Sequence, residues 1–185
     1  GRWCIAESRT ARHQIFWKMT TSVTPSLDRR TVVAELLRDR GDLLVVSGLG
    51  GTTWDVASVR DHALNFYLWG GMGNAVPMAL GLALSQPSRC VLVVTGDGEM
   101  LMGLGAFATV AVQNPTNLAI AVIDNERYGE TGNQLSHSAL GSDLTAIARG
   151  AGIKNCSTLT ELSAVVSFRD ALHTTIGPIL GVMKV

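Results

Sequence analysis

Two short apolar runs, each followed by polar residues, constrain the fold of this chain more than any other feature. Residues 91–95 (VLVVT) and 118–123 (LAIAVI) are rich in β-branched residues and do not alternate with polar ones. Such runs are typical of strands buried on both faces of a parallel sheet. Residues 100–112 between them predict a crossover helix. A strand–helix–strand unit brings the carboxyl ends of both strands to one edge of the sheet, so the residues that follow them are expected to meet there.

The residues at those two strand ends form a candidate metal site. Gly96-Asp97-Gly98 follows the first strand, and Asn125 follows the second strand 28 positions after Asp97. The carboxylate of Asp97 and the side-chain carbonyl of Asn125 are hard oxygen donors, which suit Mg²⁺ that also binds water and a diphosphate. The glycines on both sides of Asp97 allow the backbone to approach a polyanion with its N–H groups free to donate.

This spacing resembles the thiamine diphosphate (ThDP) binding motif, in which Gly-Asp-Gly is followed at a similar distance by an Asn-containing turn. The resemblance implies that Asp97, Asn125 and the main-chain oxygen of Arg127 bind Mg²⁺, which in turn holds the diphosphate. It also implies cofactor contacts from the residues around these ligands, namely Gly96, Gly98, Glu99, Tyr128 and Gly129.

A glycine-rich loop upstream resembles the part of the family's site that binds the ring system of ThDP. In residues 68–73 (LWGGMG), the resemblance assigns the carbonyl of Gly70 to the aminopyrimidine and the side chain of Met72 to the wedge beneath the bent cofactor. The bend brings the 4′-imino nitrogen next to thiazolium C2, and positioning of this kind can supply much of a barrier reduction. A methionine that fills a gap in the core is the alternative interpretation of Met72.

A second glycine-rich loop, residues 48–53 (GLGGTT), follows a strand-like run at residues 43–46. It matches the place where the family's first loop meets the diphosphate, so the resemblance implies contacts from Gly50, Thr52 and Thr53. Their amides and hydroxyls are suitable phosphate donors, although glycine-rich turns are also common without a ligand.

A dinucleotide-binding site is the alternative interpretation of these glycines. Gly71-Met72-Gly73 follows a strand-like run, opens a helix and precedes Asp97 by about the interval of the Rossmann fingerprint. However, Val76 stands where the third glycine of that fingerprint is expected, and Pro77 enters the first helical turn. Nothing in the Rossmann scheme requires Asn125. The sequence therefore favours ThDP over a dinucleotide.

The rest of the chain extends the alternation of strands and helices. Strands are expected near residues 43–46, 66–69, 91–95, 118–123, 154–156 and 179–183, and helices near residues 28–38, 54–59, 74–85, 100–112, 143–149 and 160–173. This pattern predicts an α/β protein with a three-layer α/β/α architecture and a six-stranded, mainly parallel sheet. The fold implied by the resemblance, the ThDP-binding fold, is the same.

One ThDP diphosphate-binding domain is expected over residues 25–185. Residues 1–24 differ from this domain in composition, because the stretch from Gly1 to Lys18 has four basic residues and one acidic residue, Glu7. We expect this extension to be disordered or not part of the native domain, with a targeting peptide as the alternative.

Composition excludes several classes of function. The 15 basic and 15 acidic residues give a formal charge of zero, so binding to nucleic acid or to an anionic membrane has no electrostatic basis. Only 16% of the residues are charged and 46% are hydrophobic, which indicates that another subunit covers some apolar surface. The three cysteines lie outside any CxxC pattern, which favours reduced thiols and a cytoplasmic location. No apolar run reaches the ~18 residues of a membrane span.

The loop after Asn125 narrows the expected function. Residues 128–137 (YGETGNQLSH) resemble the corresponding loop in the β subunit of split sulfopyruvate and phosphonopyruvate decarboxylases. The resemblance implies a hetero-oligomer with a pyrimidine-binding α subunit that supplies the activating glutamate, acting on a small 2-oxo acid to form an aldehyde and CO₂. Glu130 and His137 are the candidate catalytic residues of this loop, and a solvated loop histidine is the alternative for His137. Asp55 is expected to be an ordinary helix-end or surface carboxylate.

Two other functions stay open at this point. The first is an acetolactate synthase-like carboligase subunit, which would use the same cofactor. The second belongs to another class, a non-catalytic ThDP-binding or regulatory module, because the activating glutamate would have to come from another chain.

Overall fold

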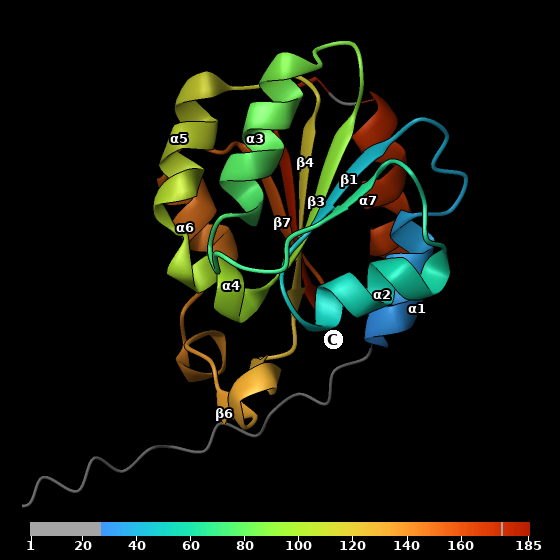
Figure 1. The fold of residues 1–185 in the computed structure, drawn as a ribbon. Coiled ribbons are helices and arrows are strands. Elements are labelled where there is room, and N and C mark those ends of the chain that lie inside the picture. Colours follow the sequence, from blue (N-terminus) through green and yellow to red (C-terminus); the bar gives the residue numbers. More distant parts are fainter. Residues whose placement is uncertain (1–26, 175) are drawn as a thin grey trace, which may run out of the picture.

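The computed structural model describes residues 27–174 and 176–185, so the expected extension over residues 1–24 lies outside the described residues. A six-stranded parallel sheet forms the centre of the molecule, with the strand order β2-β1-β3-β4-β8-β7. Helices cover both faces of this sheet (Figure 1). The predicted α/β fold with three layers is confirmed.

The bounds of the elements are as follows. The strands of the main sheet are β1 (Leu44–Ser47), β2 (Asn65–Tyr67), β3 (Val91–Gly96), β4 (Leu118–Asp124), β7 (Asn155–Leu159) and β8 (Ile179–Lys184). The helices are α1 (Arg29–Leu36), α2 (Gly51–Val59), α3 (Ala75–Ser85), α4 (Asp97–Met102), α5 (Gly105–Gln113), α6 (Leu144–Gly150) and α7 (Leu162–Thr174). A small antiparallel hairpin, β5 (Arg127–Tyr128) and β6 (Gln134–Leu135), and two 3₁₀ turns, η1 (Gly129–Thr131) and η2 (Ser138–Leu140), lie between β4 and α6.

In the four inner strands, β1, β3, β4 and β8, alternate residues enter two separate hydrophobic clusters, one on each face of the sheet. In β3, for example, Val91 and Val93 pack in one cluster and Leu92 and Val94 in the other. Helices α3, α5 and α6 cover the first cluster, and α1, α2 and α7 cover the second (Figure 1). Because both faces are covered, the strands read as continuous apolar runs, and this is why the sequence predicts them well.

The prediction of one continuous helix over residues 100–112 is wrong. The structure contains two helices there, α4 and α5, with a break at Gly103 and Leu104. At this break the backbone of Gly103 packs against the backbone of Gly73, so closely that an ideal Cβ on Gly103 would lie 2.2 Å from the carbonyl oxygen of Gly73. The contact joins segments 30 residues apart, which no local helical pattern can report. Helix α2 also begins at Gly51, three residues before the expected start.

The chain reverses its direction across the sheet at β1. Strand β2 pairs with one side of β1, and β3 pairs with the other side. At such a switch point the loops after neighbouring strands separate and leave a crevice outside their carboxyl ends. The architecture therefore predicts a ligand site between the loops that follow β1 and β3.

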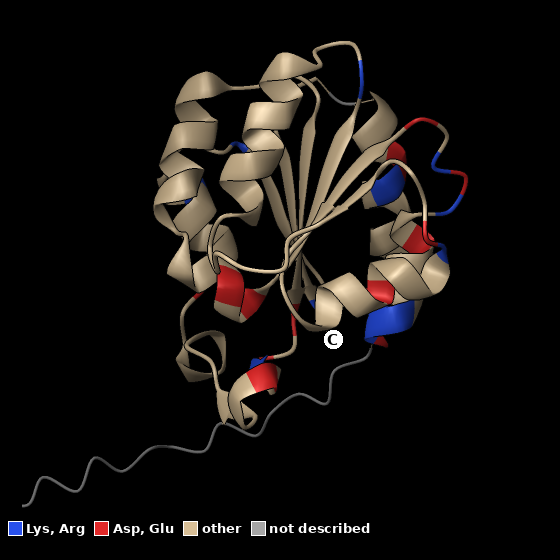
Figure 2. Ribbon diagram, viewed as in Figure 1, with Lys and Arg blue, Asp and Glu red and all other residues tan. Residues whose placement is uncertain are grey.

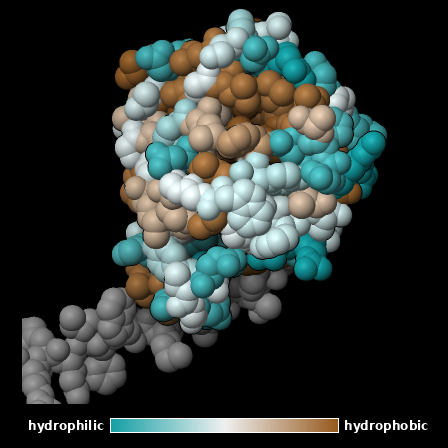
Figure 3. Space-filling view, in the orientation of Figure 1, coloured by the Kyte–Doolittle hydropathy of each residue, from teal (hydrophilic) through white to brown (hydrophobic). Residues whose placement is uncertain are grey.

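Charge is distributed unevenly over the described residues. Helices α3 and α5 contain no charged residue, and Figure 2 shows many of the charged residues near α1, α2, the start of α4 and the small hairpin. Several large apolar side chains of α3 and α5, including Met78, Leu84 and Val112, are exposed. Hydrophobic residues dominate the upper part of the surface in the same view (Figure 3). In the described ranges, no helix has both the length and the apolar character to cross a membrane.

The Gly73–Gly103 contact predicts a large difference between two alanine substitutions close in sequence. Gly103→Ala should lower the free energy of unfolding by about 1–3 kcal/mol, because the new Cβ would clash with backbone that cannot move aside easily. Gly105→Ala is the matched control, since an ideal Cβ at Gly105 meets no atom within 4 Å. Urea unfolding of both variants measures the difference, and equal stabilities would contradict the close packing.

Candidate active site

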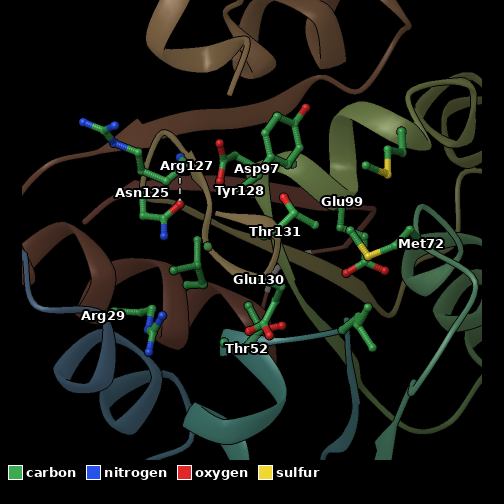
Figure 4. A pocket seen from close by; sticks show the side chains of 17 residues that line it. Arg29, Thr52, Met72, Asp97, Glu99, Asn125, Arg127, Tyr128, Glu130 and Thr131 are labelled. Atoms are coloured by element: carbon green, nitrogen blue, oxygen red, sulfur yellow. Dashed lines mark hydrogen bonds between the residues drawn. The ribbon is translucent and has the colours of Figure 1, made fainter. Parts of the chain in front are cut away.

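A cavity of about 400 Å³ lies at the carboxyl edge of the sheet, where the fold predicts a ligand site (Figure 4). The loops after β1, β3 and β4, the hairpin and the loop before α3 contribute to its walls. The lining includes many of the residues that the sequence indicated, namely Thr52, Met72, Gly96, Asp97, Gly98, Glu99, Asn125, Arg127, Tyr128, Gly129 and Glu130. It does not include Gly50, Thr53, Gly70 or His137.

Asp97 is the most deeply buried carboxylate of the cavity, with 1% of its surface exposed. It begins α4 directly after β3, so the strand fixes its position. The hydroxyls of Ser136 and Ser138 both donate to its Oδ2, the second over 2.9 Å. Burial raises the pKa of Asp97, the Ser136 hydrogen bond lowers it, and the nearby Asp124 carboxylate raises it further. Both serines engage the same carboxylate oxygen, and the Gly98 backbone is a further hydrogen-bond partner of the Asp97 carboxylate.

Asn125 lies at the end of β4 and faces the same cavity (Figure 4). Its Oδ1 accepts a hydrogen bond from the backbone N–H of Arg127 over 3.0 Å, which forms a tight turn and orients the amide. A carbonyl oxygen has two lone pairs, so one remains for a metal ion. The described residues contain no cluster of three or more His, Cys, Asp or Glu side chains suited to a metal. The predicted set differs in kind, because it combines one carboxylate, one amide and one main-chain oxygen.

Tyr128 covers the glycine that follows Asp97. An ideal Cβ on Gly98 would lie 2.5 Å from Cε1 of the Tyr128 ring, so the ring rests directly on the Gly98 backbone. The hydroxyl of Tyr128 forms a hydrogen bond of 3.2 Å with Nδ1 of His137, and the two rings meet edge to face. His137 itself is exposed and lies outside the cavity lining. Its link to the site therefore runs through Tyr128.

Glu99 is a buried carboxylate on the opposite wall of the cavity from Asn125 (Figure 4). Its Oε2 accepts a hydrogen bond of 2.9 Å from Thr95 and lies only 1.7 Å from the position of an ideal Cβ on Gly48, so only glycine fits there. Its Oε1 has no hydrogen-bond partner among the described residues. Burial raises the pKa of Glu99, while the Thr95 hydroxyl and nearby backbone amides, including those of Leu49 and Gly73, lower it.

The loop that carries Met72 is held by the contact of Gly73 with Gly103 described above. The Met72 side chain lines the cavity and is 38% exposed, so it is not a core methionine. Gly71 and Gly73 have φ values of +65° and +88°, which a residue with a Cβ rarely adopts. The two glycines therefore shape the loop that presents Met72 to the cavity.

In the loop after β1, the threonine hydroxyls are committed to the chain itself. Those of Thr52 and Thr53 both donate to the carbonyl oxygen of Gly48, over 3.0 and 2.6 Å. Their protons are thus used within the loop. The backbone N–H of Thr53 donates to the carbonyl oxygen of Gly50, so the N–H groups of Gly51 and Thr52 are the donors at the start of α2 that remain for a phosphate. Gly50 lies next to Glu130, whose Oε1 is 3.0 Å from an ideal Cβ on Gly50.

Several residues of the site escaped the sequence patterns. Ser138 bridges two buried carboxylates, because its hydroxyl lies 2.8 Å from Oδ1 of Asp124 as well as 2.9 Å from Asp97. Lys184 forms an ion pair with Asp124 over 2.9 Å. Asp55, expected to be a helix-end or surface carboxylate, is 1% exposed and pairs with Arg29 at the cavity. Each of these partners is far away in the sequence, so no motif joins them.

The family of the chain is shown by comparison with known proteins. Residues 48–178 match the family described as thiamine pyrophosphate enzyme, C-terminal TPP binding domain. The chain is 35% identical over 146 residues to the β subunit of sulfopyruvate decarboxylase from Methanocaldococcus jannaschii. The aligned region covers 78% of this chain and 77% of that protein. The chain is also 39% identical over 155 residues to phosphonopyruvate decarboxylase from Streptomyces viridochromogenes. This second alignment covers 80% of this chain and 36% of that protein.

A solved structure shares the fold. Benzoylformate decarboxylase from Polynucleobacter necessarius superposes with a TM-score of 0.72 and 21% identity, over 85% of this chain and 33% of that one. Fold, cavity and sequence thus define one class, the α/β domains that bind the diphosphate of ThDP. The chain belongs to the thiamine pyrophosphate enzymes and carries their C-terminal TPP-binding domain.

The buried Glu99 predicts a pH-dependent difference in stability. A carboxyl group whose pKa is raised by folding favours the folded state most below its unfolded pKa of about 4.3, and this advantage is lost as pH rises through the folded pKa. The free energy of unfolding of the wild type, minus that of Glu99→Gln, should therefore fall with rising pH. The slope should not exceed about 1.4 kcal/mol per pH unit, the value for one proton.

Urea unfolding of both proteins between pH 4 and pH 8 measures this difference. Asp55 and Asp97 are present and equally buried in both proteins. Their pH-dependent contributions to the free energy of unfolding therefore cancel when one value is subtracted from the other. A difference that stays constant or rises over this range would show that the Glu99 pKa is not raised.

Proposed function

We propose that this chain is the Mg²⁺–ThDP-binding subunit of a split 2-oxo-acid decarboxylase of the sulfopyruvate or phosphonopyruvate type. One observation carries the proposal. Asp97 and Asn125 line a single cavity at the switch point of a ThDP-binding fold, in a chain that is 35% identical to a sulfopyruvate decarboxylase β subunit. The relatives decarboxylate substrates with a second acidic group, so the expected substrate is a small 2-oxo acid of that kind.

The donor set fits Mg²⁺. Asp97 offers the carboxylate oxygen that the serines do not engage, Asn125 offers the second lone pair of its Oδ1, and the main chain at Arg127 follows in the same turn. All are hard oxygen ligands, and an octahedral ion would complete its shell with water and diphosphate oxygens. A cation here would also offset the burial of Asp97, whose charge has only serine hydroxyls and backbone as partners.

ThDP, when bound, supplies an electron sink that accepts the electron pair left by the departing CO₂. The residues of this chain orient the reactants and move protons. Met72 and Glu130 both line the cavity, and we assign the support of the bent cofactor to Met72. Glu130, and His137 through Tyr128, are the groups of this chain that could protonate the carbon atom and so release an aldehyde.

Exposed aromatic side chains support a partner subunit close to the site. Trp54 and Trp69 are 59% and 62% exposed, and their rings meet edge to face with centroids 5.6 Å apart. Met102, on the cavity wall, is 58% exposed. Exposed apolar side chains of this size are typical of an interaction surface. The partner we propose is a pyrimidine-binding α subunit whose glutamate activates the cofactor.

The metal assignment predicts the effect of removing Asp97. Asp97→Ala should weaken Mg²⁺-dependent ThDP binding by more than about 10-fold, because even residues that only support a metal ligand typically contribute roughly 10- to 100-fold. Asp97→Asn tests the charge without a change of shape. Calorimetry of the assembled complex measures the affinity, with the exposed Asp42→Ala as control. Unaltered ThDP affinity in both Asp97 variants would refute the metal site.

The split-enzyme proposal predicts that activity depends on a second polypeptide. The purified chain should not decarboxylate sulfopyruvate, phosphonopyruvate or pyruvate, and activity should rise and saturate as a pyrimidine-domain subunit is added. A complex with Asp97→Ala serves as the inactive control. Decarboxylation by a homogeneous preparation of this chain would refute the proposal. ThDP binding without turnover in the complex would favour a non-catalytic module, and acetolactate formation from pyruvate would favour a carboligase.

A further inference from the structure

The turn after β4 carries two of the three proposed metal ligands, the side-chain oxygen of Asn125 and the main-chain oxygen of Arg127. Glu126 lies between them and has a φ of +61°, in the left-handed region that residues with a Cβ rarely adopt. The N–H of Arg127 donates to Oδ1 of Asn125, so both ligands belong to one compact turn (Figure 4). A change of Glu126 to a negative φ would reorient the peptide groups on both sides of it. The surrounding structure therefore has to hold this residue in place.

Lys184 holds Glu126 from the neighbouring strand. In the parallel register of β4 and β8, Lys184 pairs with Asp124, the last residue of β4. Its Nζ lies 2.9 Å from Oδ2 of Asp124 and 2.5 Å from Oε1 of Glu126. The Lys184 and Glu126 side chains are 29% and 36% exposed, so solvent screens this pair less than an ion pair on the open surface. One ammonium group thus joins the end of the strand to the corner of the turn.

Backbone hydrogen bonds extend this arrangement to the third proposed ligand. The N–H of Glu126 donates to Oδ1 of Asp124 over 3.1 Å, and its carbonyl oxygen accepts from the N–H of Ser136 over 2.9 Å. The hydroxyl of Ser136 in turn donates to Asp97. The turn and the Asp97 carboxylate are therefore held by the same contacts. Asp124, Glu126 and Lys184 do not line the cavity, so they can act on a ligand only through the residues that do.

We propose that Lys184 is a positioning residue, which acts through Glu126 to keep the Asn125 and Arg127 oxygens in the geometry that Mg²⁺ requires. The inference rests on the proposed function, because that function supplies the metal. Mg²⁺ demands near-ideal octahedral geometry, whereas Ca²⁺ accepts more ligands in a flexible arrangement. A turn that is held in one conformation favours Mg²⁺ over Ca²⁺. Loss of the Lys184 contact should therefore reduce the preference for Mg²⁺ as well as the affinity.

The first experiment compares Glu126→Ala with Glu126→Gly. Both variants lose the contact with Lys184 and keep the ion pair of Lys184 with Asp124, but only alanine retains the cost of a Cβ at a positive φ. Calorimetry of the assembled complex with ThDP measures the Mg²⁺ and Ca²⁺ affinities. Glu126→Ala should weaken Mg²⁺ binding by about 5- to 30-fold, with a smaller loss for Ca²⁺, and Glu126→Gly by less than about 3-fold. Equal Mg²⁺ affinities of the two variants would overturn the proposal.

The second experiment changes Lys184 itself. Lys184→Met should weaken Mg²⁺ binding by about 10-fold or more, the loss typical of a residue that supports a metal ligand. Lys184→Arg keeps the charge and should restore the affinity to within about 3-fold. In a Glu126→Gly background, Lys184→Met should have a smaller effect, because glycine adopts the turn conformation without the contact. If Lys184→Met fails to fold, since it leaves Asp124 buried without a cation, the comparison of the two Glu126 variants still decides.

Lys154→Met is the matched control. Lys154 is exposed and forms no ion pair within the described part of the chain. This variant should change the Mg²⁺ affinity by less than about 2-fold, because solvent screens its charge. An equal loss in Lys154→Met and Lys184→Met would show a general charge effect and overturn the role of Lys184.

A third measurement tests the turn in the full chain without metal or ThDP. Hydrogen exchange at the amides of Arg127 and Ser136, whose hydrogen bonds hold the turn, should be about 5-fold or more faster in Glu126→Ala and Lys184→Met. Exchange at Val93 in the core of β3 should not change. Equal acceleration at all three amides would show a global loss of stability and overturn the positioning role.

These measurements separate the inference from the proposed function. Loss of Mg²⁺-dependent ThDP binding in Asp97→Ala, with wild-type affinity in Glu126→Ala and Lys184→Met, would retain the proposed function and refute the role of Lys184. Faster local exchange in both variants, in a protein that binds no Mg²⁺–ThDP, would support the hold of Lys184 on the turn and refute the proposed function.

Discussion

The parallel register between β3 and β4 is the constraint on which the site depends. Thr95 pairs with Val122 and Gly96 with Ile123, so the two strands end at the same level of the sheet. Asp97 follows Gly96 directly and Asn125 comes two residues after Ile123, so both lie at the carboxyl edge and line one cavity. A parallel pair is rigid when both faces are buried, as they are here. The spacing of the motif in the sequence thus becomes a fixed distance in space.

Few hydrogen-bond donors surround the two buried carboxylates behind this edge, Asp97 and Asp124. The Ser138 hydroxyl lies within hydrogen-bond distance of both Asp97 and Asp124, yet it has one proton and can donate to one of them at a time. Lys184 neutralises Asp124, and Asp97 has no cationic partner among the described residues. Burial without a counter-charge raises the pKa of Asp97. Under the proposed function, the metal ion supplies the charge that the protein omits.

The sequence predicts what is local, and it misses contacts between distant segments. The parallel strands and the Asp97–Asn125 pair were predictable, because each depends on an apolar run and the residues directly after it. The break at Gly103 was not, since its cause is the backbone of Gly73. The same holds for the ion pair of Arg29 with Asp55, which only the packing of α1 on α2 brings together. A surface and a buried carboxylate look alike in a sequence.

Helix α4 connects the two ends of the cavity. Its first residue, Asp97, belongs to the candidate metal site, and its last residue, Met102, precedes the glycine that packs against the Met72 loop. With six residues it is about 9 Å long. Glu99 lies within this helix, against the loop after β1 and close to Gly73. A single short element therefore sets the separation between the candidate metal site and the Met72 loop, so a shift of one end of this helix would move the other.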